Sequence, residues 1–387
     1  MTAMWLLRRV CERRIRAAAE RSGRSLRRDV LLLAQGDLTA FHLAAVYETL
    51  RGDRRLRFTL AGSGHLSARR ARVLARRLGL PSVGPVQAAG RFWDLILVAD
   101  HNAVRPFHPA VPAVKINHSI AAGKLVGGRP YRHGPHKILR RDGSLAYRLV
   151  LEPSEFQREL AVLTCPALAG RVAVVGDLWV DRLSRLALRR EVIRAELGLR
   201  RRERAVLICS TWGPASLFST IGQELLAEAE RLTRALTFRF IVCVHPHVWS
   251  GSRRHRRKLE KLRDRGFIVT EPGAWEAGFV AADVGLFDHT SLSVMFATLE
   301  RPMAFVTVDR GAILPRSLVE ELYLGCPRLE RTGALGALLE SCQEPDTAVL
   351  AVSAAACSHR GRAAERIREV ITEVLGLTPE TPPPAGV

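Results

Sequence analysis

Short apolar segments alternate with segments of helical periodicity along most of the chain. Apolar runs that predict buried strands occur in the first half at residues 29–35, 56–62, 94–100, 113–117, 147–151 and 171–175. Those in the second half lie at residues 205–210, 238–244, 267–270, 283–287 and 303–308. Helical patterns between them include residues 38–50, 68–78, 155–163, 216–235 and 253–265. Strands that alternate with helices predict parallel sheets joined by right-handed crossovers.

The alternation stops and restarts once, which predicts two domains. The charged segment at residues 199–204 separates the two series of strands, so the boundary falls within residues 176–204. We assign residues 29–185 to a first domain and residues 186–377 to a second. A chain of 387 residues is long for one domain and suits two of ordinary size. The predicted fold class is therefore α/β, with two Rossmann-like, doubly wound domains that face each other across a cleft.

The two ends of the chain differ from the rest in composition. Residues 1–28 combine apolar side chains with many arginines, which predicts a basic helix. Such a helix suits the surface of an anionic membrane, and equally an ordinary solvated helix that packs on its own domain. Residues 378–387 are rich in proline and are expected to be disordered. No apolar run approaches the roughly 20 residues that a membrane-spanning helix needs.

The formal charge of +21 indicates which classes of partner the protein can bind. It favours polyanions, such as an anionic membrane surface or a phosphate-rich substrate. Nucleic acid is not the expected partner, because no zinc-finger spacing, basic leucine zipper or aromatic-rich RNA-binding signature occurs. Seven scattered cysteines without a CxxC pair favour reduced thiols in a cytoplasm over a zinc site or disulfides. Acidic ligand pairs are not evident near the motifs, and neither a metal nor a cofactor is predicted.

The segment at residues 284–306 carries the sharpest local signal. It reads as a strand, a polar turn, a helix that is closed by a proline, and a second strand. In the turn, Thr290 and Ser291 follow Asp288 and are candidates for the N-cap of the helix. The first N–H groups of a helix at the carboxyl end of a parallel strand favour an anion, so the two hydroxyls can complete a phosphate cradle. The alternative is that they only cap the helix.

A histidine and a lysine follow the strand at residues 113–117. His118 stands at the carboxyl end of that strand, where it can take a proton from an attacking hydroxyl. The alternative is a histidine that is simply hydrogen-bonded at a strand end. Lys124 follows in a loop rich in glycine and basic residues, at residues 119–144. A loop of this length suggests a function, and Lys124 can reach a phosphate or remain solvated.

The second half offers comparable residues at its strand ends. His245 follows the strand at residues 238–244, and Pro246 ends that strand. Across the cleft from His118, His245 can bind a diphosphate and stabilise the charge of a leaving group. Thr211 follows the strand at residues 205–210 and can bind a nucleotide.

Two common nucleotide-binding classes are excluded by their missing motifs. No GxGxxG follows an early strand, as a dinucleotide dehydrogenase would require, and no GxxxxGK[ST] P-loop occurs. What remains is a transferase of two Rossmann-like domains, of the GT-B kind.

Taken in order, the motifs resemble the CDP-glycerol glycerophosphotransferase family, the membrane-associated primases and polymerases of teichoic-acid synthesis. The resemblance spans residues 117–309, and its last element is the most specific. It rests on Asn117-His118-Ser119 with Lys124; on Gly176, Asp181 and Leu183; on Cys209 to Gly213; on Cys243 to Pro246; and on Phe287 to Ser291, followed by Pro302.

The resemblance implies a GT-B-like fold, an acceptor-binding first domain and a donor-binding second domain. It further implies that His118 is the base on the acceptor hydroxyl and that His245 lies near the pyrophosphate. Thr290 and Ser291 would hold phosphate of a CDP-linked donor, and Asp288 would orient their turn. The expected acceptor is lipid-linked or polymeric, and the expected location is the cytoplasm, at the inner face of the cell membrane.

The chain also departs from the family pattern. The family's Trp-His-Gly is Asn-His-Ser here, and the lysine lies one residue further along. Cys243 and Gly213 replace two arginines. Two alternatives therefore stay open: a GT-B glycosyltransferase that uses a nucleotide-sugar, and a non-catalytic relative that binds polyanions or nucleic acid.

Overall fold

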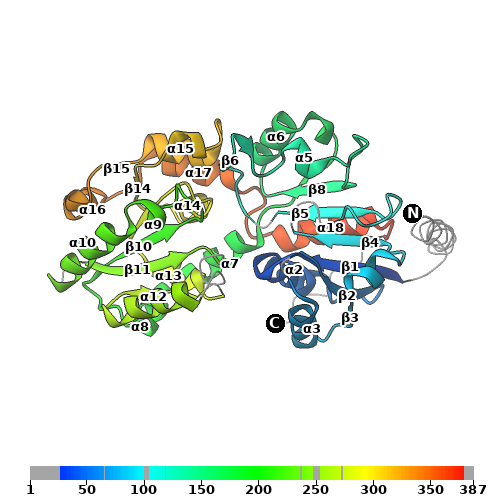
Figure 1. The fold of residues 1–387 in the computed structure, drawn as a ribbon, viewed down its shortest axis with the longest axis horizontal. Coiled ribbons are helices and arrows are strands. Elements are labelled where there is room, and N and C mark those ends of the chain that lie inside the picture. The colour runs from blue at the N-terminus through cyan, green and yellow to red at the C-terminus, as the bar shows by residue number, and fades with distance from the viewer. Residues whose placement is uncertain are drawn as a thin grey trace.

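The computed structural model describes residues 27–64, 66–99, 104–117, 119–235, 238–246, 253–271 and 273–378. Apart from Arg27, Arg28 and Thr378, the predicted basic helix at residues 1–28 and the predicted disordered tail at residues 378–387 lie outside the described residues. Within the described part, no helix is both long and apolar enough to cross a membrane. Figure 1 shows two halves, each built on its own sheet.

The first half contains a seven-stranded sheet in the order β3-β2-β1-β4-β5-β8-β9, and every neighbouring pair in it is parallel. Its strands are β1 (Arg28–Ala34), β2 (Leu56–Gly62), β3 (Ser82–Val83), β4 (Leu95–Val98), β5 (Ala113–Ile116), β8 (Leu149–Glu152) and β9 (Val172–Val174). The accompanying helices are α2 (Asp37–Leu50), α3 (Ala68–Arg77), α4 (Pro85–Ala89), α5 (Pro135–Ile138), α6 (Glu155–Thr164) and the 3₁₀ helix η1 (Pro166–Leu168).

The second half contains a six-stranded parallel sheet in the order β12-β11-β10-β13-β14-β15. Its strands are β10 (Arg204–Ser210), β11 (Phe238–Val244), β12 (Ile268–Val269), β13 (Val284–Phe287), β14 (Met303–Val306) and β15 (Arg328–Leu329). Its helices are α8 (Arg190–Glu196), α9 (Leu217–Thr220), α10 (Gly222–Arg234), α12 (Arg253–Asp264), α13 (Trp275–Ala281), α14 (Leu292–Ala297), η2 (Arg310–Ala312), α15 (Leu318–Gly325), η3 (Thr332–Ala334), α16 (Leu335–Ser341) and α17 (Thr347–Ala356).

Both sheets are covered on both faces, which explains why their strands are apolar runs without alternation. Along β1, Val30 and Leu32 belong to one core cluster, and Leu31 and Leu33 to the cluster on the opposite face. All four are at most 1% exposed. The predicted parallel α/β architecture with two doubly wound sheets is therefore confirmed.

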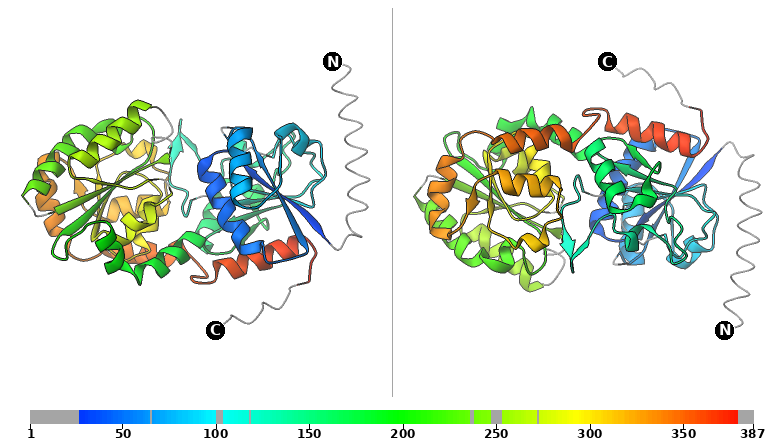
Figure 2. Two further views of the ribbon diagram at one scale, coloured as in Figure 1. Left: turned by 90° about the horizontal axis from the view of Figure 1, so that it is seen from below. Right: turned by 90° about the horizontal axis from the view of Figure 1, so that it is seen from above.

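The chain crosses between the halves twice, and this changes the predicted assignment of two helices. Helix α7 (Leu178–Ala187), predicted mostly in the first domain, packs Trp179, Val180 and Leu183 into the core of the second half. Helix α18 (Ala363–Val374), predicted in the second domain, packs into the core of the first half. The views in Figure 2 show α18, in red, along the first half. An amphipathic helix can cover either sheet, and the local pattern does not say which.

The loop predicted at residues 119–144 contains regular structure. A hairpin of β6 (Leu125–Val126) and β7 (Arg129–Pro130) is followed by α5. The hairpin turn is Gly127-Gly128, whose φ angles of 58° and 70° require residues that tolerate the left-handed region. In both views of Figure 2 this hairpin lies between the two halves.

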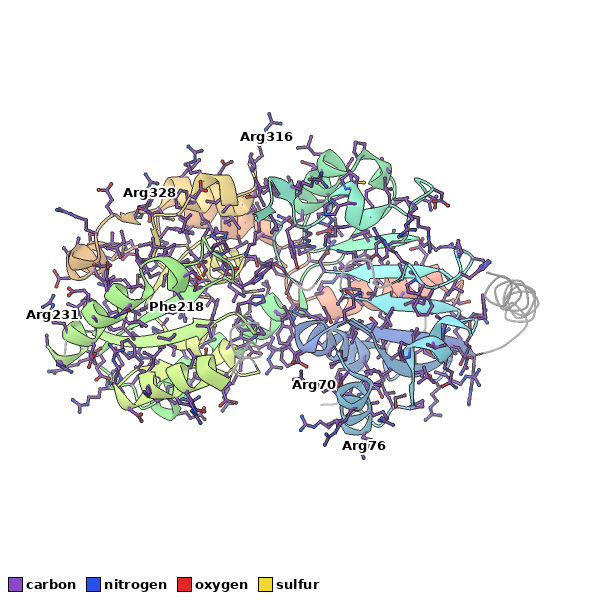
Figure 3. All side chains as sticks on the ribbon, in the orientation of Figure 1. Arg70, Arg76, Phe218, Arg231, Arg316 and Arg328 are labelled. Carbon is purple, nitrogen blue, oxygen red and sulfur yellow. The ribbon has the colours of Figure 1, made fainter. Side chains whose placement is uncertain are left out.

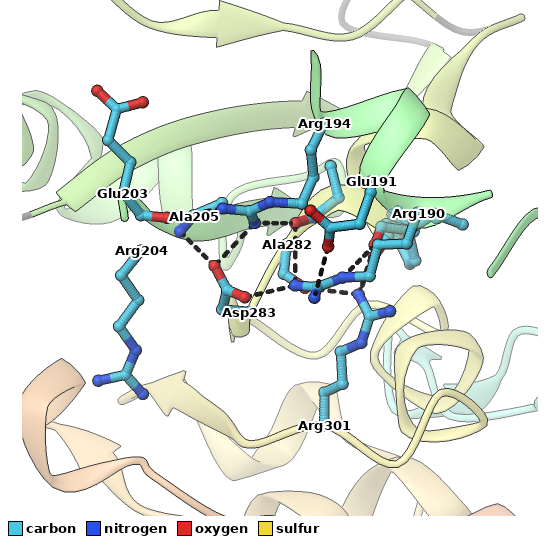
Figure 4. Close-up of polar contacts among 12 residues, drawn as sticks. Arg190, Glu191, Arg194, Glu203, Arg204, Ala205, Ala282, Asp283 and Arg301 are labelled. Carbon is cyan, nitrogen blue, oxygen red and sulfur yellow. Dashed lines mark hydrogen bonds and ion pairs between the residues drawn. The ribbon is translucent and has the colours of Figure 1, made fainter. Parts of the chain in front are cut away.

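A partly buried polar cluster fixes helices to the amino-terminal edge of the second sheet (Figure 4). The Asp283 carboxylate accepts hydrogen bonds from Arg190, from Arg194 at 2.9 Å and from the backbone N–H of Ala205 at 2.7 Å. Arg301 donates to backbone carbonyls at the end of α13, including that of Ala282 at 2.5 Å. The cluster lies at the end of the sheet opposite to the candidate site.

Candidate active site

A cavity of about 160 Å³ lies where the carboxyl ends of the two sheets meet. The first half contributes Asn117 after β5 and Asp177 after β9. The second half contributes Thr211 after β10, His245 after β11 and Thr290 after β13. Ligands bind at this end of doubly wound sheets because the strands stop there and loops can meet.

The structure brings most of the predicted site residues to this cavity. The predicted residues that line it are Lys124, Thr211, His245, Thr290 and Ser291. His118 lies outside the described residues, whereas its neighbours Asn117 and Ser119 both line the cavity. Asp288 does not form part of the cavity wall.

Lys124 reaches from the first half to a loop of the second half. Its Nζ donates a hydrogen bond to the Trp212 carbonyl at 2.5 Å and lies 3.4 Å from the Thr211 hydroxyl. The same Nζ is 3.9 Å from the centroid of the Trp212 ring, within the range of a cation–π contact. Burial lowers the pKa of Lys124 to about 8, although the negative charge of Asp288 opposes the shift. At pH 7 the amine is still mostly protonated, so it can bind an anion.

Asp288 is buried below the cavity and organises the loop after β10. Its carboxylate accepts hydrogen bonds from the Ser210 hydroxyl at 2.7 Å, from the Thr211 N–H at 3.0 Å and from the Leu217 N–H at 2.9 Å. The residue is 0% exposed. We infer that Asp288 orients Thr211 rather than touching a ligand. Its hydrogen bonds go to the loop after β10, whereas the family resemblance implies that it orients the turn of Thr290 and Ser291.

The hydroxyls of the turn after β13 have different partners. The Thr290 hydroxyl accepts from the Leu292 N–H at 3.3 Å and so caps α14, as the simpler of the two sequence interpretations expects. The Ser291 hydroxyl makes no capping bond and lies 2.7 Å from the hydroxyl of Ser119, across the cleft. Helix α14 has only six residues. The dipole of so short a helix contributes little, so binding of a phosphate here would depend on the hydroxyl side chains of the turn and on Lys124.

Three rings form one wall of the cavity beside Lys124. The Trp212 ring has its centroid 6.3 Å from that of His245 and 5.8 Å from that of Tyr131. Tyr131 comes from the first half, at the end of the hairpin, so the wall includes both halves. His245 is half-buried and faces the cavity, as predicted.

A buried ionic network supports the first-half side of the cavity. Glu152 at the end of β8 is 0% exposed and accepts from the Arg132 guanidinium at 2.7 Å. Arg132 also donates to the Ser119 carbonyl at 2.6 Å. Asn117 donates to both Glu152 and the Leu151 carbonyl, and it accepts from Lys115. The two residues that flank position 118 are therefore both fixed by this network.

The protonation states in the network follow from burial and charge. Burial alone would raise the pKa of Glu152, but Arg132 and the neighbouring His133 lower it to about 2. Burial lowers the pKa of His133 to about 4, although its ring lies 3.1 Å from Glu152. Glu152 is therefore ionised and His133 neutral at pH 7.

Sequence reasoning missed His289, between Asp288 and Thr290. It lines the cavity, is 2% exposed, and its Nδ1 has no hydrogen-bond partner among the described residues. Burial lowers its pKa, and Lys124 adds to the shift while Asp288 opposes it. Its place in the most specific motif, directly after a strand, was a signal that could have identified it.

Sequence reasoning also missed an aromatic group on the far side of the cavity. The Trp179 indole donates to His42 Nδ1 at 2.8 Å, stacks on Phe41 at 4.6 Å and lies 6.0 Å from Trp275. His42, Trp179 and Trp275 all line the cavity. No local signal pairs His42 with a residue 137 positions away.

The segment at residues 176–183 fixes both crossings of the chain. Gly176 has φ 79°, and a Cβ there would lie 2.7 Å from the Ser358 carbonyl. Asp177 caps α7 through the N–H groups of Trp179 and Val180. Asp181 accepts from the N–H groups of Gly361 and Ala363, at the start of α18. This motif is therefore structural as well as adjacent to the cavity.

Within the described residues, no group of three or more His, Cys, Asp or Glu side chains is placed to hold a metal ion.

Solved structures with the same fold include proteins of two activities. The wall teichoic acid polymerase TagF is 13% identical over 91% of this chain and 90% of its own, with a TM-score of 0.59. The S. aureus MnaA–UDP structure is 12% identical over 93% of this chain and 100% of its own, with a TM-score of 0.58. A UDP-GlcNAc 2-epimerase from Neisseria meningitidis, bound to UDP-GlcNAc, is 13% identical over 90% of this chain and 99% of its own, with a TM-score of 0.53. These likenesses establish the fold and do not choose between the activities.

Comparison with sequence families distinguishes between these two activities. No curated protein sequence matches the chain significantly. The family model of CDP-glycerol:poly(glycerophosphate) glycerophosphotransferase matches residues 129–372, which is more than half of the 387 residues. The match confirms the resemblance read from the motifs, and with it the class of transferase. The chain belongs to the CDP-glycerol:poly(glycerophosphate) glycerophosphotransferase family.

Proposed function

We propose that the cavity transfers glycerol phosphate from CDP-glycerol to a hydroxyl of a lipid-linked or polymeric acceptor in cell-envelope polymer synthesis. The observation that carries the proposal is the convergence of the family motifs: Ser119 and Ser291, 172 residues apart, place their hydroxyl oxygens 2.7 Å apart at one cavity. A solved TagF variant soaked with CDPG shares the fold, with 12% identity and a TM-score of 0.59.

The reaction breaks the phosphoanhydride bond of CDP-glycerol and forms a phosphate ester bond to the acceptor. The acceptor oxygen bonds to the phosphorus that carries glycerol, the bond from that phosphorus to the bridging oxygen breaks, and CMP leaves. Phosphoryl transfer depends mainly on positioning and on stabilising charge on the phosphate oxygens. His118 takes the proton of the acceptor hydroxyl, because a histidine titrates near neutral pH.

The donor phosphates lie between groups of the second half and Lys124. Lys124, protonated below pH 8, neutralises a phosphate charge, and the hydroxyls of Thr211, Thr290 and Ser291 accept or donate hydrogen bonds. His245 stabilises the charge that develops on the leaving CMP. Asp288 contributes indirectly, because it holds the N–H of Thr211 in place.

We also propose that the protein works in the cytoplasm, at the inner face of the cell membrane. The net charge of +21 suits both an anionic lipid surface and a polyanionic acceptor. Figure 3 shows labelled arginines that extend outwards from both halves. Helix α3 is an example: Ala71 and Ala75 are buried, whereas Arg69, Arg72 and Arg76 are exposed.

A nucleotide panel tests the donor. CDP, CMP, UDP, GDP and ADP are titrated by calorimetry against the wild type and His245→Ala, and turnover of CDP-glycerol is measured with both. His108→Ala serves as the control, because His108 is not part of the cavity wall. We expect selective binding of CDP that is lost in His245→Ala only, and turnover that is lost in His118→Ala.

Other outcomes would favour the alternatives. A preference for UDP or GDP would indicate a nucleotide-sugar glycosyltransferase. Absence of binding by every nucleotide would indicate a polyanion-binding relative. Full turnover in His118→Ala would remove the assignment of the base.

A further inference from the structure

A group of basic side chains lies beside the cavity wall, on the hairpin β6–β7, on α5 and in the segment between β4 and β5. The backbone N–H of Tyr131, which follows the hairpin, donates to the carbonyl of the cavity residue Lys124 at 2.9 Å. The Tyr131 ring lines the cavity and meets the ring of Trp212 edge to face. Tyr131 therefore connects the cavity to the outer surface of the hairpin.

Three cations gather on that outer side. The Lys137 Nζ lies 5.4 Å from the centroid of the Tyr131 ring. The Arg105 guanidinium donates to the backbone carbonyl of His136 at 2.7 Å. Burial lowers the pKa of His136, and the positive charges of Lys137, Arg129 and Arg105 lower it further, so all three lie near enough to act on this imidazole. We call Arg105, Arg129 and Lys137 the hairpin cluster.

The backbone holds these residues together. A Cβ at Gly134 would lie 2.7 Å from the His136 ring and 3.0 Å from the Pro130 carbonyl. The imidazole therefore folds back over Gly134 towards the hairpin, which is possible because this residue has no side chain. The arrangement keeps the start of α5 close to Pro130 at the end of β7.

The charges of the hairpin cluster are not balanced by acids in the part of the chain that the structure describes. Arginines elsewhere, such as Arg158 and Arg231, pair with a glutamate three residues away. No such pair joins a described carboxylate to a member of the cluster. Arg105 and Arg129 are also exposed, so an anion can reach them. Like charges held close together raise the local concentration of anions.

We propose that the hairpin cluster is a subsite for a backbone phosphate of a phosphodiester-linked acceptor chain whose terminal hydroxyl enters the cavity. The inference rests on the proposed function and adds to it the place where the acceptor is held. Each transfer of glycerol phosphate leaves a product with a phosphate a few bonds from its new terminal hydroxyl. An acceptor made by the same reaction therefore carries an anion just outside the cavity when its hydroxyl is inside.

The position of the cluster favours this partner over a lipid surface. A bilayer would meet basic residues spread over a face of the molecule, as on α3. In the hairpin cluster, Lys137 instead lies 5.4 Å from the ring of Tyr131, which is itself part of the cavity wall. Ring and cations together suit a flexible chain that bends out of the cavity along the hairpin.

The experiment compares two synthetic acceptors that carry either one or four glycerol-phosphate units on the same soluble anchor. The variant is Arg129→Ala/Lys137→Ala, and the matched control is Arg69→Ala/Arg72→Ala, which removes two exposed charges from α3. KM is measured for both acceptors with CDP-glycerol as donor. Binding of a fluorescent four-unit probe is measured separately by anisotropy, because this assay does not require turnover. CDP binding by calorimetry checks that each variant is folded.

We expect the dissociation constant of the four-unit probe and the KM of the four-unit acceptor to rise about tenfold in the hairpin variant, because charge-assisted contacts to phosphate are strong. The one-unit acceptor should respond less, and Arg129→Lys/Lys137→Arg should restore the wild-type values. Unchanged probe binding, or an equal loss in the α3 control, would overturn the proposal. So would a selective loss of binding to vesicles containing anionic lipid, since the cluster would then serve the membrane.

The two proposals can fail separately. If the wild type binds the four-unit probe through the cluster but does not turn over CDP-glycerol, the proposed reaction fails and the subsite remains. If turnover occurs and the hairpin variant behaves as the control, the subsite fails and the reaction remains.

Discussion

The two sides of the cleft are each organised by a fully buried carboxylate, but the surroundings of the two carboxylates differ. Glu152, on the first-half side, lies among charged groups: it pairs with Arg132 and bonds Asn117, which in turn accepts from Lys115. Asp288, on the second-half side, accepts its hydrogen bonds from a hydroxyl and from backbone N–H groups. Both residues are 0% exposed.

The difference predicts which property of the protein is impaired when each carboxylate is replaced. An ionic network leaves uncompensated buried charge when one member is removed, so its loss should affect the stability of the fold. A carboxylate that binds neutral N–H groups leaves unpaired donors, which costs less and acts on the loop that they belong to. We therefore expect the first-half side to be sensitive in stability and the second-half side to be sensitive in ligand binding.

The largest expected effect is that of Glu152→Gln. Replacing the carboxylate leaves Arg132 and Lys115 without their buried counter-charge, and we expect a loss of about 4 kcal/mol in the free energy of unfolding. Chemical denaturation measures it, with Glu155→Gln as the control, because Glu155 forms an exposed pair with Arg158. Equal stability of the two variants would show that the network does not hold the first-half side.

Asp288→Asn should cost about 2 kcal/mol in the free energy of unfolding, because an amide cannot accept from all three donors. We expect a larger relative effect on CDP affinity, since the Thr211 loop is no longer held. Calorimetry and denaturation should be run together with Asp309→Asn, whose exposed carboxylate accepts from the Gly311 N–H. Wild-type CDP affinity in Asp288→Asn would contradict the orienting role.

The pH dependence of CDP binding tests Lys124. The amine is charged below a pKa of about 8 and neutral above it, so binding of an anion should weaken as the pH rises. We expect the dissociation constant of CDP to rise about tenfold between pH 7 and pH 9. Lys124→Arg remains charged over this range and should abolish the slope. The same slope in that variant would assign the titration to another group.

The smallest effect concerns the contact between the two sides. A double-mutant cycle of Ser119→Ala and Ser291→Ala should give a coupling energy of about 0.5–1 kcal/mol, the usual contribution of one hydrogen bond. Unfolding and CDP binding are both measured on the two single variants and the double variant. Additive effects would show that the hydroxyls, 2.7 Å apart in the structure, do not couple the halves.

The strands and their ends could be read from the chain alone. The run at residues 238–244 is strand β11, and that at residues 56–62 is β2. Continuous apolar runs mark strands covered on both faces, and polar residues directly after such runs mark the carboxyl edge. For this reason the sequence predicts that Thr211, His245 and Thr290 stand at one edge of the second sheet, and all three line the cavity.

Other features could only come from the tertiary structure. The pattern of residues 363–374 predicts an amphipathic helix but not that it covers the first sheet. The sequence places Glu152 at the end of a strand, yet its pairing with Arg132 depends on how a loop folds back 20 residues earlier. His42 on α2 and Trp179 on α7 are 137 positions apart in sequence and meet only in the folded molecule.

Local features follow from the sequence alone: which segments are strands or helices, and which polar residues stand at their ends. Periodicity and turn chemistry act over a few residues and are written directly in the chain. Packing of the whole molecule sets which sheet each helix covers, which charges are buried together and which side chains share the cavity. Those outcomes depend on contacts between residues far apart in sequence, and many pairings satisfy the same local pattern until the cores have packed.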